Sequence, residues 1–106
     1  MLLQEVARER STYVVRMTFR DARGELIAPD TLVWSLYDGA GEIVNNRDKV
    51  AVVGPASTVE IVLTGADLAM DGLHRTEMRM VLAHATYDAG KTIRETAEFY
   101  LAKASQ

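Results

Sequence analysis

The chain has 106 residues, of which 48% are apolar and 25% are charged, and its formal net charge is −3. This length and composition suit one folded domain with a single core and exclude a disordered chain. The absence of cysteine excludes a disulfide framework, an iron–sulfur cluster and a thiolate zinc site.

Charge is distributed unevenly along the chain. Residues 1–23 contain five arginines and three acidic residues and carry +2, which leaves −5 for residues 24–106. An acidic body does not attract a phosphate backbone, so we expect no nucleic-acid partner. The first residues contain no apolar leader segment, and no run approaches the roughly 20 apolar residues of a membrane helix. We therefore expect synthesis in the cytoplasm and no membrane partner.

Residues 1–12 differ in pattern from the rest and form a predicted N-terminal arm. Leu2, Leu3 and Val6, together with Ala7, could line one side of a short helix. So short an amphipathic segment needs a partner to cover its apolar side, which makes Leu2, Leu3 and Val6 candidates for contact with a neighbouring subunit. A frayed terminus or a first β-strand is the alternative interpretation.

From residue 13 onward, apolar residues recur at every second position, which is typical of strands with one buried face. The predicted strands are residues 13–19, 32–37, 42–44, 49–53, 58–63, 75–87 and 92–101. Turn-forming residues separate them at 21–24, 38–41, 45–48, 54–57 and 88–90. Residues 64–68 resemble one helical turn that crosses between two sheets, with Leu68 as its apolar plug.

The most informative stretch is residues 29–45, which contains the only tryptophan, Trp34. Residues 32–37 alternate, the turn 38–41 contains two glycines that tolerate positive φ, and residues 42–44 resume an extended run. The pattern predicts a β-hairpin whose tryptophan packs between two sheets. The predicted core consists of large apolar residues on inward faces: Phe19, Trp34, Leu36, Ile61, Leu63, Leu82 and Phe99.

Two segments leave their role open. Residues 49–53 form either a covered inner strand or a sheet edge, and at an edge Val50 and Val52 would be interface candidates for strand addition. Residues 75–87 are apolar on both faces, as in the central strand of a sandwich. A helix is the competing interpretation there, because methionine, leucine and alanine are good helix formers. The turn at 88–90 favours the strand.

Known catalytic and metal-binding patterns are missing from the sequence. Gly-Lys-Thr at 90–92 lacks the first glycine of a phosphate-binding loop, since Ala85 stands at that position. His74 and His84 have no spacing that forms a metal site, and no serine lies in a G-x-S-x-G elbow. We therefore expect no catalytic residue, no metal site, no cofactor and no enzymatic activity.

About seven antiparallel strands separated by turns predict an all-β fold: an immunoglobulin-like β-sandwich over residues 13–104 with a short N-terminal arm. Three motifs carry a resemblance to a family. They are Pro-x-Thr-x-x-Trp-Ser-Leu-x-Asp-x-x-Gly-x-Ile-Val-Asn from residue 29, Val-x-Ile-Val-Leu-x-Gly-x-Asp-Leu from residue 59 and Tyr-Asp-x-Gly from residue 87. With these motifs, residues 13–102 resemble immunoglobulin-like proteins of tailed bacteriophages and prophages.

The resemblance implies a non-enzymatic structural subunit of the virion, such as a capsid decoration, a head–tail protein or a tail accessory protein. Such a subunit acts through protein–protein contacts, and its implied partners are other virion proteins and copies of itself. Its implied location is the virion, after synthesis in the bacterial host cytoplasm. The alternative function is a carbohydrate- or cell-surface-binding module, for which Tyr37, Tyr87 and Tyr100 are the candidate ligand-binding aromatics.

Overall fold

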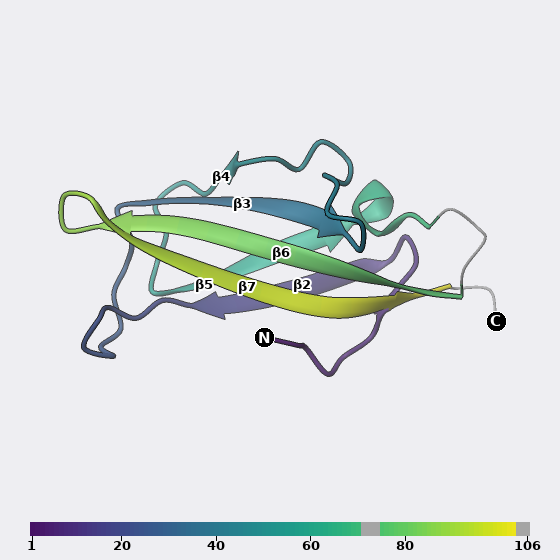
Figure 1. Ribbon diagram of the computed structural model, residues 1–106, viewed down its shortest axis with the longest axis horizontal. Coiled ribbons are helices and arrows are strands. Elements are labelled where there is room, and N and C mark those ends of the chain that lie inside the picture. The colour runs from purple at the N-terminus through teal and green to yellow at the C-terminus, as the bar shows by residue number, and fades with distance from the viewer. Residues whose placement is uncertain (71–74, 104–106) are drawn as a thin grey trace.

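The computed structural model describes residues 1–70 and 75–103, and it consists of two β-sheets that face each other (Figure 1). The strands are Ala7–Arg8 (β1), Thr12–Thr18 (β2), Thr31–Asp38 (β3), Val50–Ala51 (β4), Thr58–Thr64 (β5), Thr76–Tyr87 (β6) and Lys91–Ala102 (β7). Within the described residues, the larger sheet has the order β1-β7-β6-β3-β4 and the smaller sheet pairs β2 with β5. The chain is therefore all-β, as the alternation of apolar residues predicts.

The pairing is antiparallel except at one edge of the larger sheet. β6 lies in the middle of that sheet, antiparallel to β3 on one side and to β7 on the other. β1 runs parallel to β7, with Ala7 beside Leu101 and Arg8 beside Ala102. The larger sheet is thus mixed, and the prediction of antiparallel strands alone is wrong at β1.

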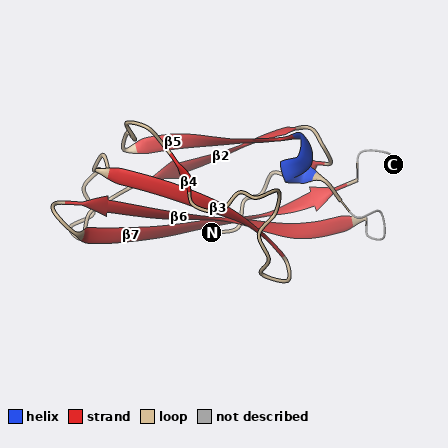
Figure 2. Cartoon of the chain, turned by 90° about the horizontal axis from the view of Figure 1, so that it is seen from above, coloured by secondary structure: helices blue, strands red, loops and turns tan. Residues whose placement is uncertain are grey.

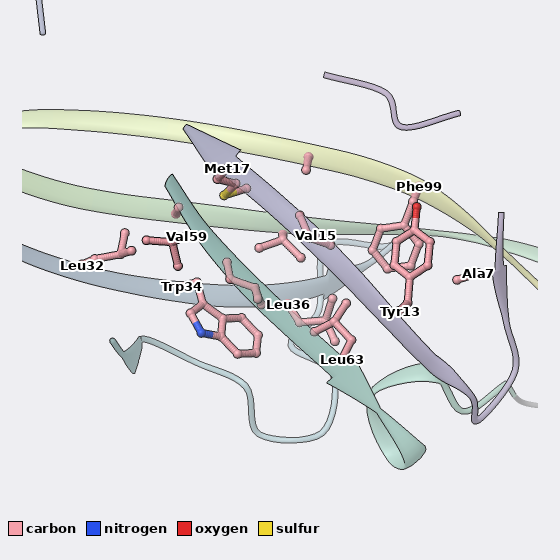
Figure 3. Close-up of a cluster of buried hydrophobic side chains, with 14 of the residues drawn as sticks. Ala7, Tyr13, Val15, Met17, Leu32, Trp34, Leu36, Val59, Leu63 and Phe99 are labelled. Carbon is pink, nitrogen blue, oxygen red and sulfur yellow. The ribbon is translucent and has the colours of Figure 1, made fainter. Parts of the chain in front are cut away.

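The core fills the space between the two layers, which Figure 2 shows from the side. Every second residue of β2 and β5 points toward the larger sheet, where it meets alternate residues of β3, β6 and β7. Figure 3 shows these side chains sharing one interior, with the ring of Tyr13 against that of Phe99 at 4.6 Å between centroids. Burial of this apolar surface is the main stabilising contribution to such a fold.

The predicted core residues occupy this interior with one exception. The six buried ones are Phe19, Trp34, Leu36, Ile61, Leu63 and Phe99. Leu82 is only partly buried, and it lies on the side of β6 that faces away from the smaller sheet. Its assignment to the core is therefore corrected. The inward positions of β6 around it are Val81, Ala83 and Ala85, and the small side chains of the two alanines leave room for the larger core residues of the other strands.

The predicted hairpin forms with a short return arm. Asp38 Oδ1 accepts hydrogen bonds from the amides of Ala40 and Glu42, both at 2.9 Å, and Gly41 has a φ of 83°. The return arm pairs with β3 only at the bridge between Tyr37 and Ile43 and does not form a strand. The turn of the predicted hairpin therefore forms, because its aspartate and glycines favour it, but the return strand does not.

The crossover after β5 has the predicted helical turn. Residues Gly65–Leu68 form a 3-10 turn, η1, which joins the smaller sheet to β6 in the larger one. Leu68 is fully buried, as expected for the apolar plug of this turn.

The N-terminal arm is extended and does not form a helix. The amide of Leu3 donates to the Glu98 carbonyl at 2.7 Å, and the Glu98 amide donates to the Met1 carbonyl at 2.8 Å. The first residues therefore cover the edge of β7 within the same chain. This arrangement satisfies backbone groups that a bare sheet edge leaves open, which a short amphipathic helix would not do.

Candidate interaction surface

On the solvent-facing side of the smaller sheet, polar and charged side chains pair with each other across the two strands. Arg16 pairs with Glu60 at 2.6 Å across the two strands, and the hydroxyls of Thr18 and Thr58 lie 3.2 Å apart. Between these pairs, Val14 and Val62 form an exposed cross-strand pair. The charged groups of this surface are thus neutralised within the sheet, and Val14 and Val62 form its exposed apolar area.

The larger sheet presents a different surface. We call its side that faces away from β2 and β5 the outer face; in Figure 1, β3, β6 and β7 lie in front of the smaller sheet. The partly buried apolar residues of this face are Val33, Tyr37, Met78, Met80 and Leu82. No described strand lies across them. An apolar stripe of this kind on the open side of a sheet is typical of an interaction surface.

Three register rows form the middle of the outer face, because directly paired residues point to the same side of a sheet. We name them by position: the basic row is Val33, His84 and Arg94, the central row is Ser35, Leu82 and Thr96, and the acidic row is Tyr37, Met80 and Glu98. The basic and acidic rows lie two residues to either side of the central row. The central row thus has Leu82 between two hydroxyl residues, and the opposite charges of Arg94 and Glu98 lie on β7 to either side of that row.

Two hollows lie over these rows. One, of about 170 Å³, is lined by residues of all three rows together with Lys49, whose amide donates to Ser35 Oγ in the central row. The other, of about 360 Å³, is lined by the acidic row, by Met78 and Arg79, and by Asp38, Gly39 and Gly41 of the hairpin turn. Within the described residues, the side chains of Lys49, Arg94 and Glu98 form no ion pair.

A buried carboxylate lies away from this face, in the 3-10 turn. Asp67 is fully buried, and its Oδ1 accepts hydrogen bonds from Asn45 Nδ2 at 2.9 Å and Arg47 Nε at 2.8 Å. Its Oδ2 accepts from Arg47 Nη2 at 3.3 Å and from the Thr64 amide at 3.1 Å. This cluster ties the crossover between the sheets to the loop that follows the hairpin.

The electrostatics of this cluster favour the ionised pair. Burial alone would raise the pKa of Asp67, but the hydrogen bonds from Arg47, Asn45 and the Thr64 amide, with the charge of Arg47, lower it below the ordinary value. The hydrogen bond and charge of Asp67 raise the pKa of Arg47. A carboxylate held in this way is structural, because all its acceptor positions are occupied by groups of the same chain.

A second buried charge, Arg79, lies at the end of the inward face of β6. Its guanidinium pairs with Glu77 and donates to the Ala69 carbonyl at 2.6 Å. The contact holds the segment after η1 against β6. Neither Arg79 nor Asp67 is among the residues that the sequence singles out for a role, since local pattern does not show which distant groups will pair.

The interface candidates that the sequence predicts occupy two edges of the larger sheet. Leu2 and Val6 are about half exposed, and Leu3 is partly buried beside β7. Val50 lies in the edge strand β4 opposite Trp34, and Val52 follows it with its amide donating to the Leu32 carbonyl at 2.9 Å. Both valines are partly buried and pack against the core. These residues flank the larger sheet and do not form part of the three rows.

The candidate aromatic and histidine residues lie in different surroundings. Tyr87 is buried, Tyr37 is partly buried on the outer face and Tyr100 is exposed near its edge. His84 is partly buried in the basic row, and His74 lies outside the described residues. The outer face itself was missed as a site by sequence reasoning. The available signal was the second apolar face of residues 75–87, since a two-sheet domain covers only one face of each sheet.

The described residues contain no group of three or more His, Cys, Asp or Glu side chains that could hold a metal ion. Among the same residues, no helix has the length and hydropathy of a membrane span. Comparisons with protein-family models, with curated proteins and with solved structures gave no match.

Proposed function

We propose that the protein is a non-enzymatic structural subunit of a tailed-phage particle that acts through protein–protein contacts. The observation that carries this proposal is the outer face, an apolar surface with unpaired charges at its ends on an otherwise well-packed domain. Such a face favours a partner that covers it, whereas catalysis would need converging reactive groups. The resemblance of the three sequence motifs to phage proteins suggests the kind of particle.

An immunoglobulin-like sandwich is the fold we propose for this subunit. In that fold, strands B and E lie in one sheet and strands C, F and G in the other. The pairing of β2 with β5, opposite the order β7-β6-β3, supports this assignment, and β4 then corresponds to the additional strand beside C. The parallel strand β1 is added at the edge of β7 and leaves the antiparallel order of the other strands unchanged.

The carbohydrate-binding alternative has less support. Of its three candidate aromatics, Tyr87 is in the core, and Tyr37 and Tyr100 are on different strands with β6 between them. No row of exposed aromatic rings is formed on the outer face by the described residues. A glycan ligand would therefore meet methionine, leucine and valine side chains, which stack poorly on sugar rings.

The test is mass spectrometry of particles purified from a host that expresses the gene with its neighbouring phage genes. We expect the chain in the particle fraction at a fixed ratio to the major capsid or tail protein. A free hexahistidine-tagged copy of the chain, mixed with finished particles and separated by sedimentation, controls for surface adsorption. Absence of the chain from washed particles that contain all other virion proteins would contradict the proposal.

A further inference from the structure

We propose that the outer face binds the outer face of a second copy of this chain. The two copies form a symmetric pair. Its two-fold axis runs parallel to the central row, in the plane between the larger sheet of one copy and the larger sheet of the other. This inference rests on the proposed role in protein–protein contacts and names one partner for it, the chain itself.

The charges of the outer face are self-complementary about the central row. Arg94 and Glu98 lie on the same strand, two residues to either side of Thr96. A two-fold rotation about the central row reverses the strand direction and keeps each strand over its own copy. Arg94 of one copy then faces Glu98 of the other, and the same contact forms a second time by symmetry. Each symmetric pair therefore contains two opposite-charge contacts.

Arg94 and Glu98 are the charges that give this complementarity. The Lys49 amide meets Ser35 in the central row, and Asp38 is in register with the inward Arg79, so neither residue belongs to the basic or the acidic row. An unrelated partner would not require opposite charges at matched spacing about one row, so this symmetry favours a second copy.

The same rotation also brings apolar side chains of the two copies into contact. Leu82 lies on the axis and contacts Leu82 of the second copy, because residues on a two-fold axis meet themselves. Met80 lies opposite His84 of the second copy, beside the hollow of about 170 Å³ in the basic end. Leu82 and Met80 of β6 are therefore covered, and Arg94 and Glu98 lie beside them on β7. This division into an apolar core and a polar rim is the usual anatomy of an interface.

The area of the face predicts a weak dimer. Three strands about 4.8 Å apart, over the eight residue steps from Met78 to Thr86 at about 3.4 Å each, give a flat area of about 400 Å² per copy. Two copies thus bury about 800 Å² in projection and more when protruding side chains are included, which is the low end for specific interfaces. We therefore expect dissociation in dilute solution and association at high local concentration.

The first experiment measures self-association by sedimentation velocity of the purified chain, from about 1 µM to about 1 mM, a range that covers weak complexes. We expect a concentration-dependent dimer. Leu82→Asp should raise the dissociation constant at least about tenfold, because it places two carboxylates against each other on the axis. The matched control is Val62→Asp, a similar change at an exposed position on the outer side of the smaller sheet; it should leave the dissociation constant unchanged.

The second experiment exchanges charges and does not depend on the behaviour of Leu82. Arg94→Glu alone places acidic side chains opposite each other, and Glu98→Arg alone places arginines opposite each other, so each variant should be monomeric. An equimolar mixture of the two variants should form a heterodimer, because every acidic side chain then faces an arginine. The double variant Arg94→Glu/Glu98→Arg should form a homodimer again. Circular dichroism of each variant verifies that it is folded.

Three results would overturn the inference: a wild-type chain that stays monomeric over the whole range, a dimer lost in Val62→Asp but kept in Leu82→Asp, or single charge variants that fail to associate when mixed. A monomeric chain that is still present in purified particles would refute the dimer and leave the virion role intact. A chain that dimerises but is absent from particles would do the reverse.

Discussion

Replacing Asp67 by asparagine tests the buried cluster between the 3-10 turn and the loop after the hairpin. The substitution keeps the size of the side chain, removes its charge and replaces one acceptor oxygen by an NH₂ group. The Arg47 guanidinium and the Thr64 amide donate to Oδ2, and Asn45 and Arg47 donate to Oδ1. Whichever way the asparagine amide is oriented, at least one existing donor then faces another donor.

The magnitude follows from the burial of the two partners. Breaking a fully buried ion pair costs about 3–5 kcal/mol. Asp67 is fully buried, but the Arg47 side chain is 39% exposed, so water can solvate part of the guanidinium after the substitution. The loss of a charge-assisted hydrogen bond and of a partner for a buried amide each contribute about 1–3 kcal/mol. We expect Asp67→Asn to lower the free energy of unfolding by about 2–4 kcal/mol.

Urea unfolding followed by the fluorescence of Trp34, which is buried in the folded chain, measures this loss. The control is Asp30→Asn at an exposed position, which should change the free energy of unfolding by no more than about 0.5 kcal/mol. Equal, small effects of the two substitutions would refute the structural role of Asp67.

The pH dependence gives a second readout of the same pair. The pKa of Asp67 is lower in the folded chain than its ordinary value, so its contribution to stability is complete above the unfolded pKa, about 4. It declines as the pH falls below that value toward the folded pKa, where the carboxylate takes up a proton. The difference in stability between the wild type and Asp67→Asn should therefore shrink as the pH is lowered below about 4. A difference that stays constant or grows would contradict the assigned ion pair.

Four other substitutions test the packing, with the chain diluted enough to be monomeric. Trp34→Ala should lower the free energy of unfolding by about 3–5 kcal/mol, measured by urea unfolding with circular dichroism, and a loss below about 1 kcal/mol would contradict its place between the sheets. Leu36→Ala should cost about 2–5 kcal/mol, but Leu82→Ala only about 1 kcal/mol, and equal losses in the same assay would contradict their assignment to opposite faces. Tyr13→Phe removes a 2.7 Å hydrogen bond to the Glu5 carbonyl and should cost about 0.5–1.5 kcal/mol, with faster amide hydrogen exchange in the arm; unchanged exchange would show that this bond does not hold the arm.

The sequence predicts the strands and the inward faces where alternation is clean. In β2 and β5 every second residue is exposed, and all of these are polar except Val14 and Val62, so the alternation indicates which face is buried. β6 is apolar on both faces, and nothing in its own sequence says which face meets the smaller sheet. That is the physical reason why Leu82 was assigned to the core. The choice is made by the partner strands, which place Ala83 and Ala85 inward.

The sequence left a first β-strand open for the N-terminal arm, as β1 is, but the pairing of the arm with β7 and the Asp67 cluster could not be predicted because they depend on distant groups. The arm has a weak helical pattern, but the open backbone edge of β7 offers hydrogen bonds that outweigh this local preference. The sequence around Asp67 indicates only a helical turn. Its partners Asn45 and Arg47 lie about 20 residues earlier in the chain. Sequence spacing does not show such a contact before the sheets are stacked.

The Asp67 cluster also affects the outer face, because it positions the loop that carries Lys49. The Arg47 carbonyl accepts a hydrogen bond from the Leu36 amide at 2.9 Å, while the Arg47 guanidinium is held by Asp67. Two residues later, the Lys49 amide donates to Ser35 Oγ at 2.9 Å, at the end of the central row. A loop fixed at both points loses little conformational freedom when the outer face meets a partner, which favours binding. We therefore expect that Asp67→Asn weakens self-association as well as stability, although Asp67 itself is buried and does not belong to the three rows.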